Sequence, residues 1–326
     1  MTRRAVRTPR SLGALPPVRR SSPGRPLRAR ALSLSTILCT ALLLATGCAP
    51  SRPAPAPAPE PAPVSAPIPL PEKPVPVDPL AEPWVVGAPT APVTQELVVT
   101  TVVRAAASAA TLATAHSDSS RTALTVRWDG TEDMTRRSGA ITAYRVGPAA
   151  LASATTVPAG LTLPVALSAA LDAGRGAVHV TSPDDARCAA DAAAAQLARE
   201  VLVAPPSPLA RGLTWADSLR TTVCRDSIPL ALTSIRRYVV EDARVQEGRA
   251  VVVIRRRSSI TLSGAGTQFG EAVTITGEGT GELLFGLRLD DGQMTDGNGI
   301  STLTLTLVGR RKSQVVTQGA RLEIRR

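Results

Sequence analysis

Two histidines are the first residues to consider for catalysis, because imidazole is the commonest general base in proteins. His116 lies in Ala115-His-Ser-Asp-Ser-Ser120, a run that also contains the serine and carboxylate types of a Ser/His/Asp hydrolase. The chain has no Gly-x-Ser-x-Gly motif of the kind that holds a nucleophilic serine. We therefore expect His116 at a solvated hairpin tip and His179, between two valines, on the polar face of a strand. The sequence predicts no catalytic residue.

Other polar stretches suggest ion binding only superficially. Asp290–Asn298 collects carboxylate and amide oxygens, which calcium prefers, but Ser301 stands where the closing glutamate of an EF-hand would be. The glycines of Ser263–Gly270 and Gly277–Gly281 precede no helix that could hold a phosphate. Hairpin turns and strand bends explain both patterns. We therefore expect no metal site and no cofactor.

Three consecutive arginines, Arg255-Arg-Arg257, lie within an expected strand. Because side chains alternate along a strand, Arg256 should face opposite to its two neighbours. The run is interpreted as a charge cluster that guards a strand against edge-to-edge association.

The first 47 residues have the order of a secretory signal peptide. Nine arginines and no acidic residue occupy the first 30 positions, and an apolar stretch follows at about 31–45. A permanent transmembrane helix needs about 20 apolar residues, so this stretch is short for one. We expect residues 1–47 to be removed.

The four residues Ala45-Thr-Gly-Cys48 resemble the lipobox of bacterial lipoproteins, with Ala45 where leucine is usual. The resemblance implies cleavage before Cys48, fatty acylation of its thiol with chains such as palmitate, and acylation of the new amino terminus. Two or more chains anchor a protein stably to a membrane. Ala49, rather than an aspartate, follows the cysteine, which implies the outer membrane if the host has two. An ordinary signal peptide cut near Cys48 is the alternative.

The net charge of +11 belongs mostly to the signal segment. Removing its nine arginines from 37 basic residues leaves 28 against 26 acidic ones, or +2. Aromatic residues make up only 2% of the chain. A near-neutral protein with few stacking side chains lacks the features of nucleic-acid binders, so no nucleic-acid partner is expected.

The four cysteines reduce to one pair in the mature domain, because Cys39 lies in the signal segment and Cys48 would carry lipid. In an exported protein, the remaining Cys188 and Cys224 predict a disulfide. A metal site is the weaker alternative, since neither histidine has metal-ligand spacing to a cysteine.

Residues 48–92 are expected to form a linker, in which proline recurs every second or third position up to about Pro92. Proline fixes φ and lacks an amide donor, so this segment cannot form a helix or the interior of a sheet. We expect an extended, disordered, semi-rigid spacer between the membrane and the folded domain.

Residues 93–326 alternate apolar and polar side chains, most clearly in Leu303-Thr-Leu305-Thr-Leu307. This period of two is typical of antiparallel strands with one solvated face. Glycine-rich and charged turns separate the runs at hairpin distances. We expect a mainly β meander with strands at roughly 94–105, 121–130, 139–147, 160–171, 177–181, 218–225, 229–241, 249–263, 270–287, 293–308 and 313–325.

One helix is predicted near residues 183–202. Ser182 is a suitable N-cap, Pro183 suits the first helical position, and the stretch from Ala189 to Glu200 is rich in alanine. Cys188 would then lie in the second turn, and a disulfide to Cys224 would join the helix to the strand after Trp215. The expected fold is a curved antiparallel sheet with one packed α-helix.

This arrangement resembles the half-barrel clamps of bacterial envelope lipoproteins and lipoprotein carriers. Residues 205–218 and Gly277–Gly281 are also similar to uncharacterised bacterial lipoproteins in which a proline, a glycine and a tryptophan precede a β-meander. The resemblance implies an envelope β domain and assigns no catalytic residue.

The first functional hypothesis is therefore a lipid-anchored envelope lipoprotein, not an enzyme, that binds or carries an apolar ligand such as a lipid. The abundance of leucine and valine favours an alkyl chain over a sugar. A scaffolding lipoprotein that binds an envelope protein is the second hypothesis, and an envelope hydrolase is the third. An apolar cavity of about 300 Å³ between sheet and helix would favour the carrier, and a filled core the scaffold.

Overall fold

The computed structural model describes residues 80–150, 156–225, 227–268, 270–310 and 312–326. The predicted signal peptide, Cys48 and the linker as far as residue 79 lie outside these ranges. Within them, no helix has both the length and the apolar character needed to cross a membrane.

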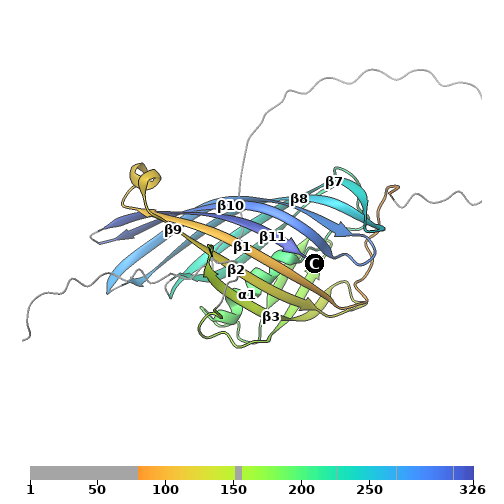
Figure 1. Ribbon diagram of the computed structural model, residues 1–326, viewed down its shortest axis with the longest axis horizontal. Coiled ribbons are helices and arrows are strands. Elements are labelled where there is room, and N and C mark those ends of the chain that lie inside the picture. The colour runs from red at the N-terminus through yellow and green to blue at the C-terminus, as the bar shows by residue number, and fades with distance from the viewer. Residues whose placement is uncertain (1–79, 151–155, 226, 269, 311) are drawn as a thin grey trace, which may run out of the picture. The chain divides into compact units, whose positions relative to one another are not determined.

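The described residues form a single antiparallel sheet of eleven strands in the order β5-β4-β3-β2-β1-β11-β10-β9-β8-β7-β6 (Figure 1). Because β1 pairs with β11, the first and last strands of the chain meet in the middle of the sheet, and β5 and β6 form its two edges. The mainly β fold predicted from alternation is confirmed. The strands are β1 Val93–Ala106, β2 Ser117–Trp128, β3 Arg136–Pro148, β4 Val165–Asp172, β5 Ala177–Thr181, β6 Thr214–Arg225, β7 Ile228–Gln246, β8 Arg249–Gln268, β9 Glu271–Arg288, β10 Met294–Gly309 and β11 Ser313–Arg325.

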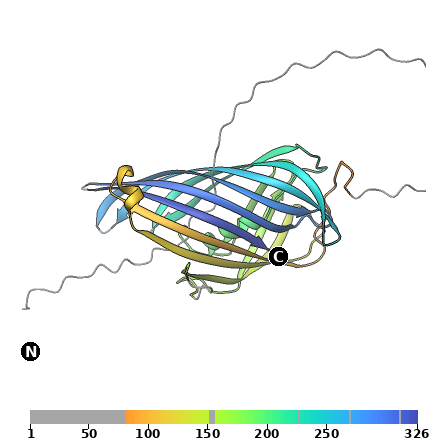
Figure 2. The ribbon, with the colours of Figure 1, turned by 45° about the horizontal axis from the view of Figure 1, so that its top comes forward.

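Alternation sets which side chains face inward. In β10, Leu303, Leu305 and Leu307 are buried while the threonines between them point outward. The pairing register shifts between Thr125 and Val126 and again in β7 and β10, and such irregularities increase twist. The sheet therefore curls around its apolar face, as Figure 2 shows.

The two edge strands come together and nearly close the sheet. A Cβ placed on Gly176, just before β5, would lie 2.5 Å from Cδ1 of Trp215 in β6. In the described part of the chain no backbone ladder joins β5 to β6, so the seam between them is held by side chains.

The helix packs on the concave side of the sheet, but it is shorter than predicted. α1 spans Ala190–Ala198 and continues into the 3-10 turn η2, Arg199–Val201. Ser182 does not cap it; its hydroxyl donates to the carbonyl of Asp184. Cys188 has a φ of 66°, in the left-handed region, so the helix cannot begin before it.

The predicted disulfide is present. Cys188 and Cys224 are bonded, with 5.3 Å between their Cα atoms. Because α1 starts after Cys188, the bond joins the loop before the helix, rather than the helix itself, to the end of β6. A second 3-10 turn, η1 Ala109–Thr114, lies between β1 and β2.

The interior contains two apolar clusters. The first, the helix-side core, joins strands β1–β5 and the adjoining ends of β7–β11 to the buried face of α1, which consists of Ala194, Ala195, Leu197 and Ala198. Trp84, which precedes β1, also packs there and pairs with Leu209. The second, the strand-only cluster, consists of Ile228, Leu230, Leu232, Ile260, Leu262, Ile275, Leu303, Leu305, Leu307 and Val316.

Candidate functional site

The two histidines lie on the surface. His116 precedes β2, and its Nε2 is 3.4 Å from Oδ1 of Asp118, with both side chains more than 80% exposed. Such an open pair has no surrounding wall to exclude water from a reaction. His179 is exposed on β5, as predicted for the polar face of a strand.

Only the first part of the acidic stretch Asp290–Asn298 forms the turn between β9 and β10, because β10 begins at Met294. The carboxylates of this turn are paired with arginine side chains. Asp290 accepts hydrogen bonds from Arg249 and Arg288, and Asp291 forms an ion pair with Arg288 at 2.6 Å. Burial raises the pKa of Asp291 although Arg288 opposes that shift. Across the described ranges, no three His, Cys, Asp or Glu side chains gather as metal ligands would.

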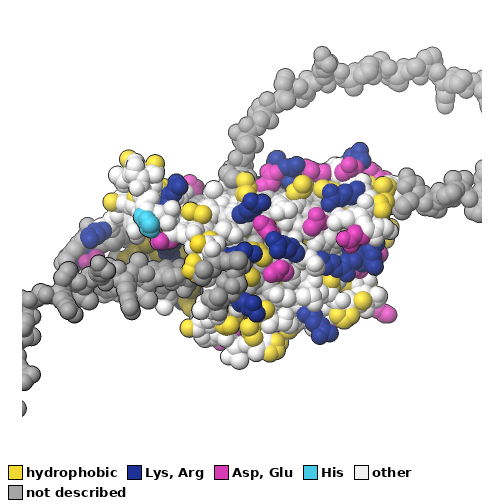
Figure 3. All heavy atoms as spheres, in the orientation of Figure 1, with side chains coloured by type: hydrophobic (Ala, Val, Ile, Leu, Met, Phe, Trp, Pro, Cys, Tyr) yellow, Lys and Arg dark blue, Asp and Glu magenta, His cyan; other side chains and the backbone are white. Residues whose placement is uncertain are grey.

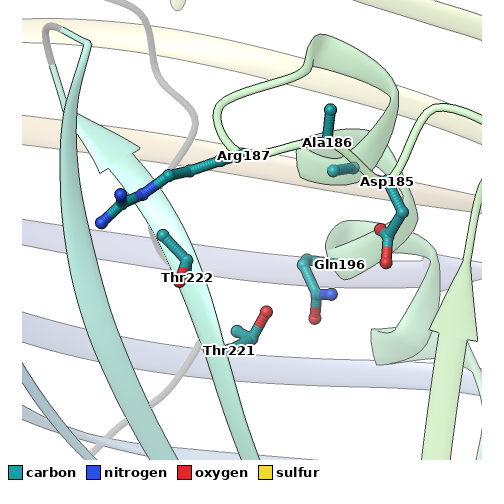
Figure 4. Close-up of a pocket in the computed structure, with 7 residues that line it drawn as sticks. Asp185, Ala186, Arg187, Gln196, Thr221 and Thr222 are labelled. Atoms are coloured by element: carbon teal, nitrogen blue, oxygen red, sulfur yellow. The ribbon is translucent and has the colours of Figure 1, made fainter.

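A half-open pocket of about 250 Å³ lies between α1, the loop before it and β6. Figure 4 shows Gln196 from the helix and Thr221 from the strand near its centre, with the charged groups of Asp185 and Arg187 around it. Its lining is largely polar. The apolar cavity that would favour a carrier is therefore not found here, and the buried face of α1 packs directly into the helix-side core.

The most ordered polar arrangement is a buried charge network formed by η2 and three neighbouring strands. It consists of Arg199 and Glu200 from η2, Asp217 from β6, Arg236 and Tyr238 from β7, and Arg256 from β8. Strand alternation points the four strand residues inward, and the end of the helix brings Arg199 and Glu200 down onto them.

Asp217 is the centre of this network, and only 3% of it is exposed. Arg199 Nη2 donates to its Oδ1 at 2.8 Å, Arg236 Nη2 to Oδ2 at 2.9 Å, and the Tyr238 hydroxyl to Oδ2 at 3.0 Å. Arg199 Nε also donates to the carbonyl of Val178 in β5 at 2.7 Å. Arg199 therefore bridges the two edge strands and closes the seam.

The electrostatics follow from burial and mutual contact. Burial by itself would raise the pKa of Asp217, but Arg236 and Arg199 outweigh it and hold that pKa below its ordinary value. Burial and the neighbouring charge of Arg236 lower the pKa of Arg199 to about 10. Burial raises the pKa of the Tyr238 phenol to about 12, so it stays a hydrogen-bond donor near neutral pH.

The network holds more positive than negative charge. It has three guanidiniums (Arg199, Arg236 and Arg256) and two carboxylates (Asp217 and Glu200). Glu200 is therefore shared by Arg256, at 2.5 Å, and Arg236, at 3.6 Å. Arg256 Nε and Nη1 and Arg236 Nη1 have no hydrogen-bond partner, although all three atoms are buried. An unsatisfied buried donor costs about 1–3 kcal/mol, and more when it is charged. The network therefore lacks hydrogen-bond acceptors for these three nitrogens.

A polar belt runs across the inner face of the sheet and includes part of this network. On β8, Ile254 belongs to the helix-side core and Ile260 to the strand-only cluster, with Arg256 and Ser258 between them. Other strands repeat the pattern, so the belt separates the two apolar clusters. Its buried members are Thr101, Thr122, Asp217, Ser234, Arg236, Arg256, Ser258, Ser301 and Gln318.

The strand-only cluster beyond the belt differs from the helix-side core in what it packs against. Each of its side chains comes from β7, β8, β9, β10 or β11, and no described helix or loop contributes a member. It contains isoleucine, leucine and valine without an aromatic ring. Next to it, β9 presents three inward glycines, Gly277, Gly279 and Gly281. A Cβ on Gly277 would lie 2.5 Å from Leu305 Cδ2 and 3.0 Å from Leu262 Cδ1, so these leucines fill the space above it.

Sequence reasoning missed the buried charge network. The prediction that Arg256 faces opposite to its neighbours is correct, since Arg255 and Arg257 are on the outer face and pair there with Glu282. Its interpretation as a protective surface charge is wrong, because only 2% of Arg256 is exposed. The sequence did carry a signal for this burial. Ile254, Arg256 and Ile260 are separated by even numbers of residues, so they share one face of the strand, and two isoleucines indicate that this face is the core.

No protein-family model matches this sequence. No curated protein matches it either.

Proposed function

We propose that this protein is a membrane-anchored envelope lipoprotein that binds an apolar ligand along the strand-only cluster. The lipobox-like residues Ala45–Cys48, after a basic and an apolar segment, support the anchor. The order of signal, proline-rich linker and folded domain supports a site held away from the membrane. On the resemblance, the outer membrane is the proposed location in a host with two membranes.

One observation carries the ligand proposal: the sheet has a second apolar cluster to which no described helix or loop contributes. The helix α1 covers the helix-side core. The members of the strand-only cluster are each at most 8% exposed although no described helix packs on them, so a ligand would insert among buried side chains rather than lie on an open face. An aliphatic lining without rings suits an alkyl chain. We therefore propose the ligand site beyond the polar belt rather than beneath the helix, where the sequence had led us to expect it.

The outer face of the sheet carries charged side chains, in contrast to the aliphatic strand-only cluster inside. Figure 3 shows basic and acidic side chains interspersed over the visible face, with hydrophobic side chains scattered among them. Arg255, for example, lies between Glu241 and Glu282. On this visible face no strip of one charge stands out for a nucleic acid to follow.

Binding of hexadecanol by the full mature chain tests the proposal. Hexadecanol should bind saturably and raise Tm, since a ligand selective for the native state stabilises it. Leu305→Ala, within the strand-only cluster, should weaken hexadecanol binding by about fourfold or more, as one lost methylene contact contributes about 0.8 kcal/mol. Leu283→Ala is the matched control, because Leu283 is equally buried but belongs to the helix-side core.

A scaffolding lipoprotein is the second candidate, favoured by the tight packing of α1 against the sheet. If hexadecanol neither binds nor changes Tm, the ligand proposal fails and the scaffold becomes the better explanation. Equal weakening by Leu305→Ala and Leu283→Ala would place any binding outside the strand-only cluster.

A further inference from the structure

The buried charge network, part of which lies in the polar belt, has the charge and free donors of an anion site. Arg199, Arg236 and Arg256 bring three positive charges, and Glu200 and Asp217 bring two negative ones, so one positive charge is uncompensated. These five side chains are each at most 8% exposed. A buried excess charge is unfavourable unless a counter-charge comes to it.

The free donors lie on two arginines that share a neighbour. Arg256 Nη2 donates to Glu200 at 2.5 Å, which leaves its Nε and Nη1 without partners. Arg236 Nη1 is 3.6 Å from the same carboxylate and makes no hydrogen bond. Arg199 contrasts with both, because it donates to Val178 and Asp217 and has no unpartnered nitrogen among the buried atoms.

The position of these donors links them to the strand-only cluster. Arg236 is two inward positions from Leu232 along β7, and Arg256 is two inward positions from Ile260 along β8. Both Leu232 and Ile260 belong to the strand-only cluster. Four residues of strand span about 13 Å. Since Arg236, Arg256, Leu232 and Ile260 are each at most 8% exposed, a single extended molecule that inserts among these buried side chains would reach both the arginines and the aliphatic residues.

We propose that the polar belt binds the carboxylate of a long-chain fatty acid whose alkyl chain lies on the strand-only cluster. The single uncompensated positive charge matches one carboxylate, which accepts charge-assisted hydrogen bonds from the free nitrogens of Arg256 and Arg236. This inference rests on the proposed function, since it supplies the headgroup site for the same ligand.

The test compares hexadecanoate with hexadecanol on the full mature chain, because the two probes share an alkyl chain and differ in headgroup charge. Hexadecanoate should bind at least about tenfold more tightly than hexadecanol. Arg256→Met should bring the network to zero net charge and remove that preference. Arg257→Met, on the outer face at 58% exposure, is the matched control and should keep it.

A measurement on the unmodified chain keeps the proposal testable if Arg256→Met does not fold. The carboxyl carbon of bound [1-13C]hexadecanoate should titrate below the pH at which the free acid titrates, because nearby guanidiniums favour the ionised form. Titration at higher pH would mean an apolar surrounding and would overturn the headgroup site. Equal affinity for both probes would overturn it while leaving the proposed function intact, and binding of neither would overturn both.

Discussion

Asp217 shows how one carboxylate can hold several elements together. It accepts hydrogen bonds from Arg199, Arg236 and Tyr238, and Arg199 in turn reaches the carbonyl of Val178 across the seam. The ring of Tyr238 stacks on Trp215, with centroids 4.8 Å apart. The orientation of the end of the helix and the closure of the sheet therefore depend on the same acidic side chain.

Asp217→Asn should lower the free energy of unfolding by about 3–5 kcal/mol near neutral pH, because it leaves buried guanidiniums without their counter-charge. The loss should shrink in acid. The folded pKa of Asp217 lies below its ordinary value, so its contribution is complete above about pH 4 and disappears as the pH falls through the folded pKa. Urea unfolding at several pH values measures both effects.

The control is Asp242→Asn, which removes the partner of Arg211 in an ion pair whose side chains are 60% and 63% exposed. Exposed pairs contribute at most about 1 kcal/mol, so this variant should remain close to the parent. If Asp217→Asn were equally mild, the network would not support the fold in the way described.

Sequence alternation predicts which face a residue occupies, but it does not predict its partner. Arg256 could be assigned to the inner face from Ile254 and Ile260 alone. Its pairing with Glu200, 56 residues away, depends on where α1 ends and how strongly the sheet curls. Neither the end of α1 nor the curl of the sheet is encoded in the residues next to Arg256, so the network as a whole could not be predicted.

At the scale of elements, the strand meander was predictable and the start of the helix was not. Each strand carries its own period-two pattern between turn residues, which is a local property. The Ser-Pro-Asp-Asp sequence at residues 182–185 is equally compatible with a helix start and with the loop that is observed. In the observed loop Cys188 has a φ of 66° and is bonded to Cys224, a contact across 36 residues that the local sequence does not encode.

Replacing both Cys188 and Cys224 by serine tests the role of that constraint. The double variant should lose about 2–4 kcal/mol of stability, the range typical of a disulfide. The loss of amide protection in hydrogen exchange should concentrate in the loop before α1 and in the end of β6, because these are the segments that the bond joins.

The central pairing of β9 with β10 should keep its protection in the double variant, since those strands lie inside the sheet and away from the bond. Uniform loss of protection over the whole sheet would instead mean that the disulfide acts on global stability alone. Loss of folding would show that it is needed to form the domain.

At the scale of the whole molecule, the folded domain and the amino-terminal segment have to be argued from different properties. The domain is specified by alternation and burial, whereas the predicted signal peptide and anchor rest on charge order, hydropathy and Ala45–Cys48. The proposed ligand site gains a biological setting only if the domain is attached to a membrane, where long-chain fatty acids are supplied.

Mass spectrometry of the membrane-extracted protein tests this attachment directly. We expect a mature chain that begins at Cys48 and carries two or more acyl chains, and whose mass rises by two hydrogens when the Cys188–Cys224 bond is reduced. Cys48→Ser should shift the protein from the membrane to the soluble fraction, since it removes the thiol that is proposed to be acylated. Cys39→Ser is the control, because Cys39 lies in the segment that is predicted to be removed, so this variant should stay on the membrane. An unmodified soluble chain in the parent protein would refute the anchor, yet hexadecanoate binding would still be measurable, so membrane attachment and ligand binding can be decided independently.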